Sequence, residues 1–152
     1  AYVSAEESCY LNHDERQEGF LGGLKQCGIT QCMIQAGDYS YESGYRAGDR
    51  IFASGLPVEA IFCANDLMAL GVMDCGRLKD KYVPGEDYSI MGLDDTFAAS
   101  LRSYSLTVLQ QQNDILCKEA VRVLIENMEN PEMPPETVAV PMQLIVRNTV
   151  RH

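Results

Sequence analysis

Polar side chains follow two apolar runs of this chain at the point where each run ends. Asn65 and Asp66 directly follow one run, and Asp94 and Asp95 directly follow another. An amide both donates and accepts hydrogen bonds, and a carboxylate can accept two from adjacent hydroxyls, as a sugar presents them. Ligands of parallel α/β sheets bind outside the carboxyl ends of the strands. The pattern therefore predicts one site for a small polar molecule.

The same four residues also have a purely structural interpretation. Asn65 and Asp66 stand where a helix begins, and both residue types are favoured at helix N-termini. Asp94 and Asp95 could form a solvated turn before another helix. The two interpretations are compatible if Asp66 caps the helix while Asn65 faces a ligand.

Three further residues are candidates for the same site. Arg16, in the segment ERQEGF, could bind a ligand or pair with a surface carboxylate. Tyr39 follows a predicted strand end, where its ring could lie against the apolar face of a sugar or simply form part of a loop. Gln111, the second of three successive glutamines, could cross a polar cleft or belong to a solvated linker.

Catalytic and metal-binding signals are weak in comparison. No Gly-rich phosphate loop follows a strand, and we find no convincing set of nucleophile, base and orienting residue. The six cysteines form no C-x-x-C pair, so reduced thiols used as small hydrophobic residues are favoured over zinc or disulfides. We therefore expect a binding protein without cofactor or metal, and not an enzyme.

The elements that position these residues alternate regularly. Short apolar runs predict strands at residues 1–4, 30–36, 58–64 and 88–92, and longer patterns predict helices at 12–27, 41–54, 66–79 and 113–128. A short extended run covers 106–109, and residues 138–150 have the pattern of a strand. Strand–helix–strand repeats favour right-handed βαβ units, and the predicted fold class is therefore α/β with a parallel sheet flanked by helices.

Composition limits the class of protein. The length of 152 residues fits one domain, and the net charge of −10 disfavours this chain itself as a surface for DNA, RNA or an anionic membrane. DNA contacts through a segment outside this sequence stay possible. No apolar run approaches a membrane span, and no signal peptide is visible. Together with the cysteine usage, this favours a cytoplasmic protein.

In order and spacing, these segments resemble the effector-binding domain of the lac-repressor family of bacterial transcription regulators. The segments that carry the resemblance are ERQEGF, AGDYSYESGYRAG, AIFCANDLMALGVM, VPGEDYSIMGLDD, LTVLQQ and LIVRNTVRH. The resemblance implies one lobe, plus a crossing segment, of a two-lobed fold like that of periplasmic binding proteins. It also implies that the residues matching Arg16, Tyr39, Asn65, Asp94 and Gln111 line the ligand cleft. Asn113 and Ser105 depart from residues common in the family, which leaves the ligand's identity open.

The resemblance further divides the chain. Residues 1–109 correspond to the second lobe, residues 110–137 to the crossing segment and a helix that belongs to the first lobe, and residues 138–152 to a terminal strand. The DNA-binding headpiece and most of the first lobe lie outside this sequence. The resemblance also implies a homodimer, with the helix around residues 67–73 as a candidate contact.

The function that follows is sensing a sugar-like effector for a transcriptional regulator. Two alternatives stay open. One is a periplasmic sugar-binding protein of a transporter, which shares the fold. The other is a small α/β enzyme that uses Asp94 or Asp95 as a base.

Overall fold

The structure, a computed structural model, describes residues 1–5, 13–134 and 136–151. Its core is a six-stranded sheet with the strand order β2-β1-β3-β4-β5-β6. The strands are β1 (Tyr2–Ala5), β2 (Ile34–Gly37), β3 (Ala60–Cys63), β4 (Ser89–Leu93), β5 (Thr107–Gln110) and β6 (Gln143–Ile145). Strands β1 to β5 pair in parallel, and only β6 is antiparallel. The predicted α/β class and parallel sheet are confirmed.

Helices connect these strands, and four of them are predicted from the sequence. They are α1 (His13–Gln26), α2 (Tyr41–Ala53), α3 (Asp66–Cys75), the short α4 (Phe97–Ser100) and α5 (Asn113–Glu129). Right-handed crossovers place α1 on one face of the sheet and α2 and α3 on the other. The face changes because β2 lies on one side of β1, whereas β3 and β4 follow on the other side. On the face of α1, the rings of Tyr2, Phe20 and Phe62 stack with centroids 5.0 to 5.8 Å apart.

Glycine allows α2 and α3 to pack backbone against backbone. A Cβ atom on Gly44 would lie 2.1 Å from the carbonyl oxygen of Met68, and one on Gly71 would lie 2.2 Å from that of Tyr41. Neither position has room for a side chain. This close contact fixes the amino end of α3 and hence the residues that begin it.

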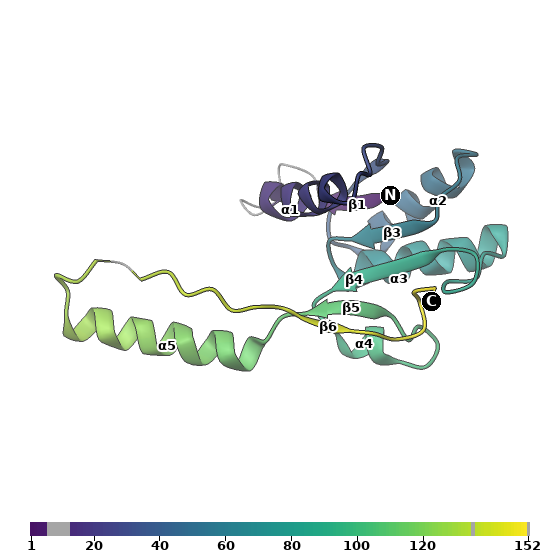
Figure 1. The fold of residues 1–152 in the computed structure, drawn as a ribbon. Coiled ribbons are helices and arrows are strands. Elements are labelled where there is room, and N and C mark those ends of the chain that lie inside the picture. Colours follow the sequence, from purple (N-terminus) through teal and green to yellow (C-terminus); the bar gives the residue numbers. More distant parts are fainter. Residues whose placement is uncertain (6–12, 135, 152) are drawn as a thin grey trace.

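The structure also differs from the sequence-based expectations. The strand predicted at residues 138–150 is reduced to β6, because the segment before it runs alongside α5 rather than the sheet (Figure 1). Helix α4 was not predicted, since four residues carry too little periodicity. The helix predicted to residue 79 ends as an α-helix at Cys75 and continues as a π-helix over Gly76–Asp80.

Helix α5 extends away from the sheet beyond the carboxyl ends of the parallel strands (Figure 1). None of its residues is buried. Six of its large apolar side chains are exposed: Ile115, Leu116, Val121, Leu124, Ile125 and Met128. The cysteines that the structure describes are all free thiols, namely Cys27, Cys32, Cys63, Cys75 and Cys117, whereas Cys9 lies outside the described residues.

Candidate functional site

The five predicted site residues each follow the carboxyl end of a different parallel strand. Four of them come within two residues of a strand end: Tyr39 after β2, Asn65 after β3, Asp94 after β4 and Gln111 after β5. Arg16 lies in the first turn of α1, which follows β1. Because these strands run parallel, the five residues share one edge of the sheet. All five residues are partly exposed.

Arg16, Tyr39 and Asn65 form one connected group. The Arg16 guanidinium donates to the carbonyl oxygen of Ala64 at 2.9 Å and lies over the Tyr39 ring, 5.9 Å from its centroid. The Asn65 Nδ2 donates to the carbonyl oxygen of Tyr39 at 2.9 Å. Tyr39 has a backbone φ of 65°, in the left-handed region that residues other than glycine rarely adopt. The hydrogen bond from Asn65 therefore holds an unfavourable turn in place.

Asp94 and Gln111 form the second group. The Gln111 Nε2 donates to Asp94 Oδ1 at 2.6 Å, which joins the ends of β4 and β5. Burial raises the pKa of the Asp94 carboxyl, while the Gln111 hydrogen bond and the charge of Arg16 oppose that shift. The charge of Arg16 thus favours the ionised form of the Asp94 carboxyl.

The helix-capping question has a definite answer. Asn65, not Asp66, is the N-cap of α3, and its Oδ1 accepts from the backbone N–H of Met68 at 3.0 Å. The arrangement in which Asp66 caps and Asn65 is free for a ligand is therefore wrong. Both ends of the Asn65 amide have partners within the protein, although the side chain stays partly exposed. Asp66 is fully buried instead.

Asp95 is also committed to contacts within the protein. Its carboxylate accepts from Gln110 Nε2 at 2.8 Å and pairs with Arg147 at 2.5 Å. Sequence reasoning considered Gln110 only as part of the glutamine run and did not single out Arg147. Arg147 lies 52 residues further along the chain than Asp95, and no spacing pattern signals such a pair.

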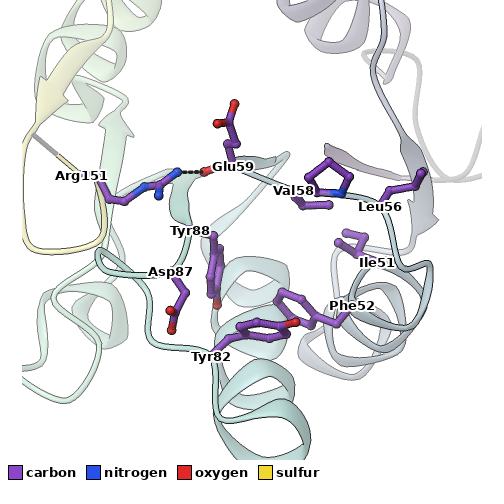
Figure 2. A pocket seen from close by; sticks show the side chains of 10 residues that line it. Ile51, Phe52, Leu56, Val58, Glu59, Tyr82, Asp87, Tyr88 and Arg151 are labelled. Atoms are coloured by element: carbon purple, nitrogen blue, oxygen red, sulfur yellow. Dashed lines mark hydrogen bonds between the residues drawn. The ribbon is translucent and has the colours of Figure 1, made fainter.

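A cavity of about 280 Å³ lies elsewhere, at the amino ends of β3 and β4 (Figure 2). Its wall includes the aromatic rings of Phe52, Tyr82 and Tyr88, with Glu59 and Arg151 at the other side. None of the five site residues lines this cavity. It is therefore separate from the edge that carries them.

Among the residues that the structure describes, no group of three or more His, Cys, Asp or Glu side chains could hold a metal ion. No helix in the same residues is long and apolar enough to cross a membrane. The arrangement at the sheet edge offers hydrogen-bond donors, acceptors and one aromatic ring, which suits binding.

Comparison with known proteins gives a consistent result. Residues 1–150 match the family described as periplasmic binding protein-like domain. The chain is 28% identical to the HTH-type transcriptional repressor PurR of Mannheimia succiniciproducens, over 99% of the chain and 45% of that protein. It is 29% identical to the HTH-type transcriptional repressor CytR of Escherichia coli K12, over 90% of the chain and 40% of that protein.

Solved structures agree. A lac repressor dimer bound to operator and the anti-inducer ONPF matches with a TM-score of 0.90 and 26% identity, over 100% of this chain and 52% of that one. The complex of the transcriptional regulator CelR with cellobiose matches with a TM-score of 0.88 and 25% identity, over 98% of this chain and 46% of that one. This chain spans less than half the length of PurR and of CytR, the two sequence relatives named above. PurR and CytR are transcriptional repressors and not enzymes.

Proposed function

Because this chain belongs to the periplasmic binding protein-like domain family, as found in regulators of the lac-repressor type, we propose that it senses a small-molecule effector for a transcriptional regulator. The effector is a polyhydroxylated molecule, a sugar or sugar derivative. No chemical step is part of this function. The observation that carries the proposal is the convergence of five accessible polar or aromatic side chains at one edge of the sheet.

Each group at the edge has a role that suits a sugar. Asp94 presents a carboxylate already oriented by Gln111, ready to accept hydrogen bonds from adjacent hydroxyls. The Tyr39 ring offers a flat surface to the apolar face of a sugar ring, and Arg16, which lies over it, supplies donors. The complex of CelR with cellobiose, among the structural relatives, supports this ligand class.

The partner of α5 is part of the same proposal. Residues 1–109 form the second lobe, residues 110–137 cross to a first lobe, and residues 138–152 return as the terminal segment. The exposed apolar face of α5, which includes Leu124 and Met128 at 59% and 73% exposure, is then covered by that first lobe. The ligand lies between the lobes, so its binding favours one arrangement of them.

Signal output follows from the same geometry. A homodimer in the cytoplasm couples the arrangement of the lobes to operator affinity through a DNA-binding headpiece, which is a coupling free energy between two sites. Helix α3 contributes to the dimer contact, with Leu67 partly exposed at its start. The net charge of −10 is consistent with DNA contacts made by another segment.

Calorimetric titration of the full chain, as the cell makes it, tests the effector class. The panel begins with cellobiose and with ONPG, the molecule bound in a solved lac repressor structure that is 26% identical to this chain, and it extends to other mono- and disaccharides. Asp94→Ala should weaken binding of any sugar that binds the wild type by about tenfold to a hundredfold, the loss of one charged hydrogen-bonding group. Glu42→Ala, an exposed acidic residue in the first turn of α2, is the matched control. Equal affinity of Asp94→Ala and wild type would contradict the site.

A periplasmic sugar-binding protein of a transporter shares the fold. The named relatives are repressors, which favours the regulator.

A further inference from the structure

Asp66 is a fully buried carboxyl group at the start of α3. Its Oδ2 accepts from the backbone N–H of Thr96 at 2.7 Å, and its Oδ1 has no hydrogen-bond partner among the residues that the structure describes. Burial raises the pKa of this carboxyl, hydrogen bonding from Thr96 opposes that shift, and the charges of Asp94 and Asp95 add to it. Burying a carboxyl group costs free energy unless hydrogen bonds compensate for the lost contacts with water.

The contact that Asp66 makes closes the turn that carries Asp94. Asp94 and Asp95 have φ values of 127° and 63°, both in the region that L residues rarely adopt. The turn then ends at Thr96, which is the N-cap of α4. The Asp66 carboxylate accepts the Thr96 N–H at this end, so it holds the turn in its unfavourable conformation.

Strand β4 is shaped to pass beside this carboxyl. A Cβ atom on Gly92 would lie 2.5 Å from Asp66 Oδ1, so only glycine fits there without displacing it. Asp66 is thus held between β4 and the turn that follows β4. From the other side, Gln111 holds the Asp94 side chain.

A helix-dipole role does not account for these observations. An acidic residue in the first turn stabilises a helix from an exposed position, as Glu42 does in α2. Asp66 is instead buried and bonded to a different element, 30 residues along the chain.

We propose that Asp66 is a positioning residue of the effector site: by accepting the Thr96 N–H, it fixes the turn of residues 94–96 and so sets the direction of the Asp94 carboxylate. Asp66 does not contact the effector. This inference rests on the proposed function, since it gives Asp94 the role of contacting the effector.

Three variants of the full chain separate the hydrogen bond from other effects. Asp66→Asn keeps a side-chain oxygen that accepts from Thr96. Asp66→Ala removes it, and Asp66→Leu removes it while keeping nearly the same shape, so a folded variant without the acceptor is available if the alanine protein unfolds. Glu42→Ala is the control, and thermal unfolding establishes that each variant is folded.

The first readout is amide hydrogen exchange at Thr96, measured without ligand. We expect exchange within about threefold of wild type in Asp66→Asn and at least about tenfold faster in Asp66→Ala and Asp66→Leu. The second readout is affinity for the sugar that binds the wild type most tightly in the panel begun with cellobiose and ONPG. It should fall at least about tenfold in the same two variants and be kept in Asp66→Asn.

The outcomes distinguish this inference from the proposed function. If wild type binds no sugar of the panel, the proposed function fails and the role of Asp66 in effector binding fails with it. If wild type binds and Asp66→Leu binds equally well, only the inference about Asp66 is overturned. It is also overturned if Asp66→Asn is as damaging as Asp66→Leu, because the charge would then matter and not the accepted hydrogen bond.

Discussion

The Asn65 side chain joins two strand ends: its Nδ2 donates to the carbonyl oxygen of Tyr39 at 2.9 Å, while its Oδ1 accepts from the N–H of Met68 at 3.0 Å. One amide thereby caps α3 and holds the turn after β2. Asparagine is suited to this position, because aspartate lacks the donor and serine is too short to reach both partners. The residue that begins the sequence argument for a ligand site is thus also a structural link within it.

Replacing Asn65 should therefore affect stability as well as binding. Asn65→Ala should lower the free energy of unfolding by about 1–2 kcal/mol, from the lost cap and the lost hydrogen bond together. Asn65→Asp keeps the cap acceptor and should cost less. Urea denaturation of the variants measures both. Equal destabilisation by the two variants would show that the bond to Tyr39, and not the cap, dominates.

The Tyr39 ring should matter for effector affinity more than its hydroxyl does. Tyr39→Phe and Tyr39→Trp keep a flat aromatic surface and should largely preserve affinity, whereas Tyr39→Ala should weaken it. Titration of the full chain with its effector gives the comparison. If Tyr39→Phe lowers effector affinity as much as Tyr39→Ala does, the hydroxyl group contacts the effector and the proposed stacking of the ring is wrong.

Gly71 should tolerate no side chain, because α2 and α3 touch there. A Cβ atom would lie 2.2 Å from the Tyr41 carbonyl oxygen and 2.6 Å from the Tyr45 nitrogen. Gly71→Ala should lower the free energy of unfolding by at least about 2 kcal/mol. Gly22→Ala is the matched control, since Gly22 is an exposed residue of α1 with nothing within 4 Å of a new Cβ. The control should be stabilising by about 0.5–1 kcal/mol.

Stability should depend on pH through Asp66. Its folded-state pKa is raised above the unfolded value near 3.8, so between the two values the folded protein binds more protons than the unfolded chain. The free energy of unfolding therefore falls as pH rises from about 4, until the pH exceeds the folded-state pKa. Asp66→Asn should remove this component. Part of the slope should persist, because burial also raises the pKa of Asp94.

Denaturation curves at several pH values test this expectation. Asp94, Asp95 and the buried Cys63 thiol are the titratable groups that interact with Asp66. In the double variant Asp66→Asn, Asp94→Asn, the free energy of unfolding should depend less on pH than in either single variant. If the free energy of unfolding of Asp66→Asn depends on pH as steeply as that of wild type, Asp66 is not a source of the pH dependence.

The apolar face of α5 should cause residues 1–152 to associate when studied alone. Leu124→Glu introduces a charge at a 59% exposed position of that face and should shift the population toward monomer. Lys118→Gln, a change at another exposed position of α5, is the control. Light scattering coupled to size-exclusion chromatography measures both. A wild-type chain that is a clean monomer at all concentrations would contradict the expectation.

Sequence alone determined the α/β class, the four main strand–helix alternations and the edge of the sheet that carries the candidate site residues. These features depend on local periodicity and on a general rule of parallel sheets, so Asn65 and Asp94 could be placed at one edge of the sheet before any coordinates. The sequence also carried the resemblance to lac-repressor regulators, which the family match and the repressor relatives together confirmed.

Only the tertiary structure decided how the polar residues divide their roles. Asn65 rather than Asp66 caps α3, because Asp66 turns inward to Thr96, a partner on another element. Tertiary packing also decided that Asp95 pairs with Arg147 and that the last strand has only three residues. Each depends on which distant segments pack together, and contacts between residues far apart in sequence leave no periodic signal along the chain.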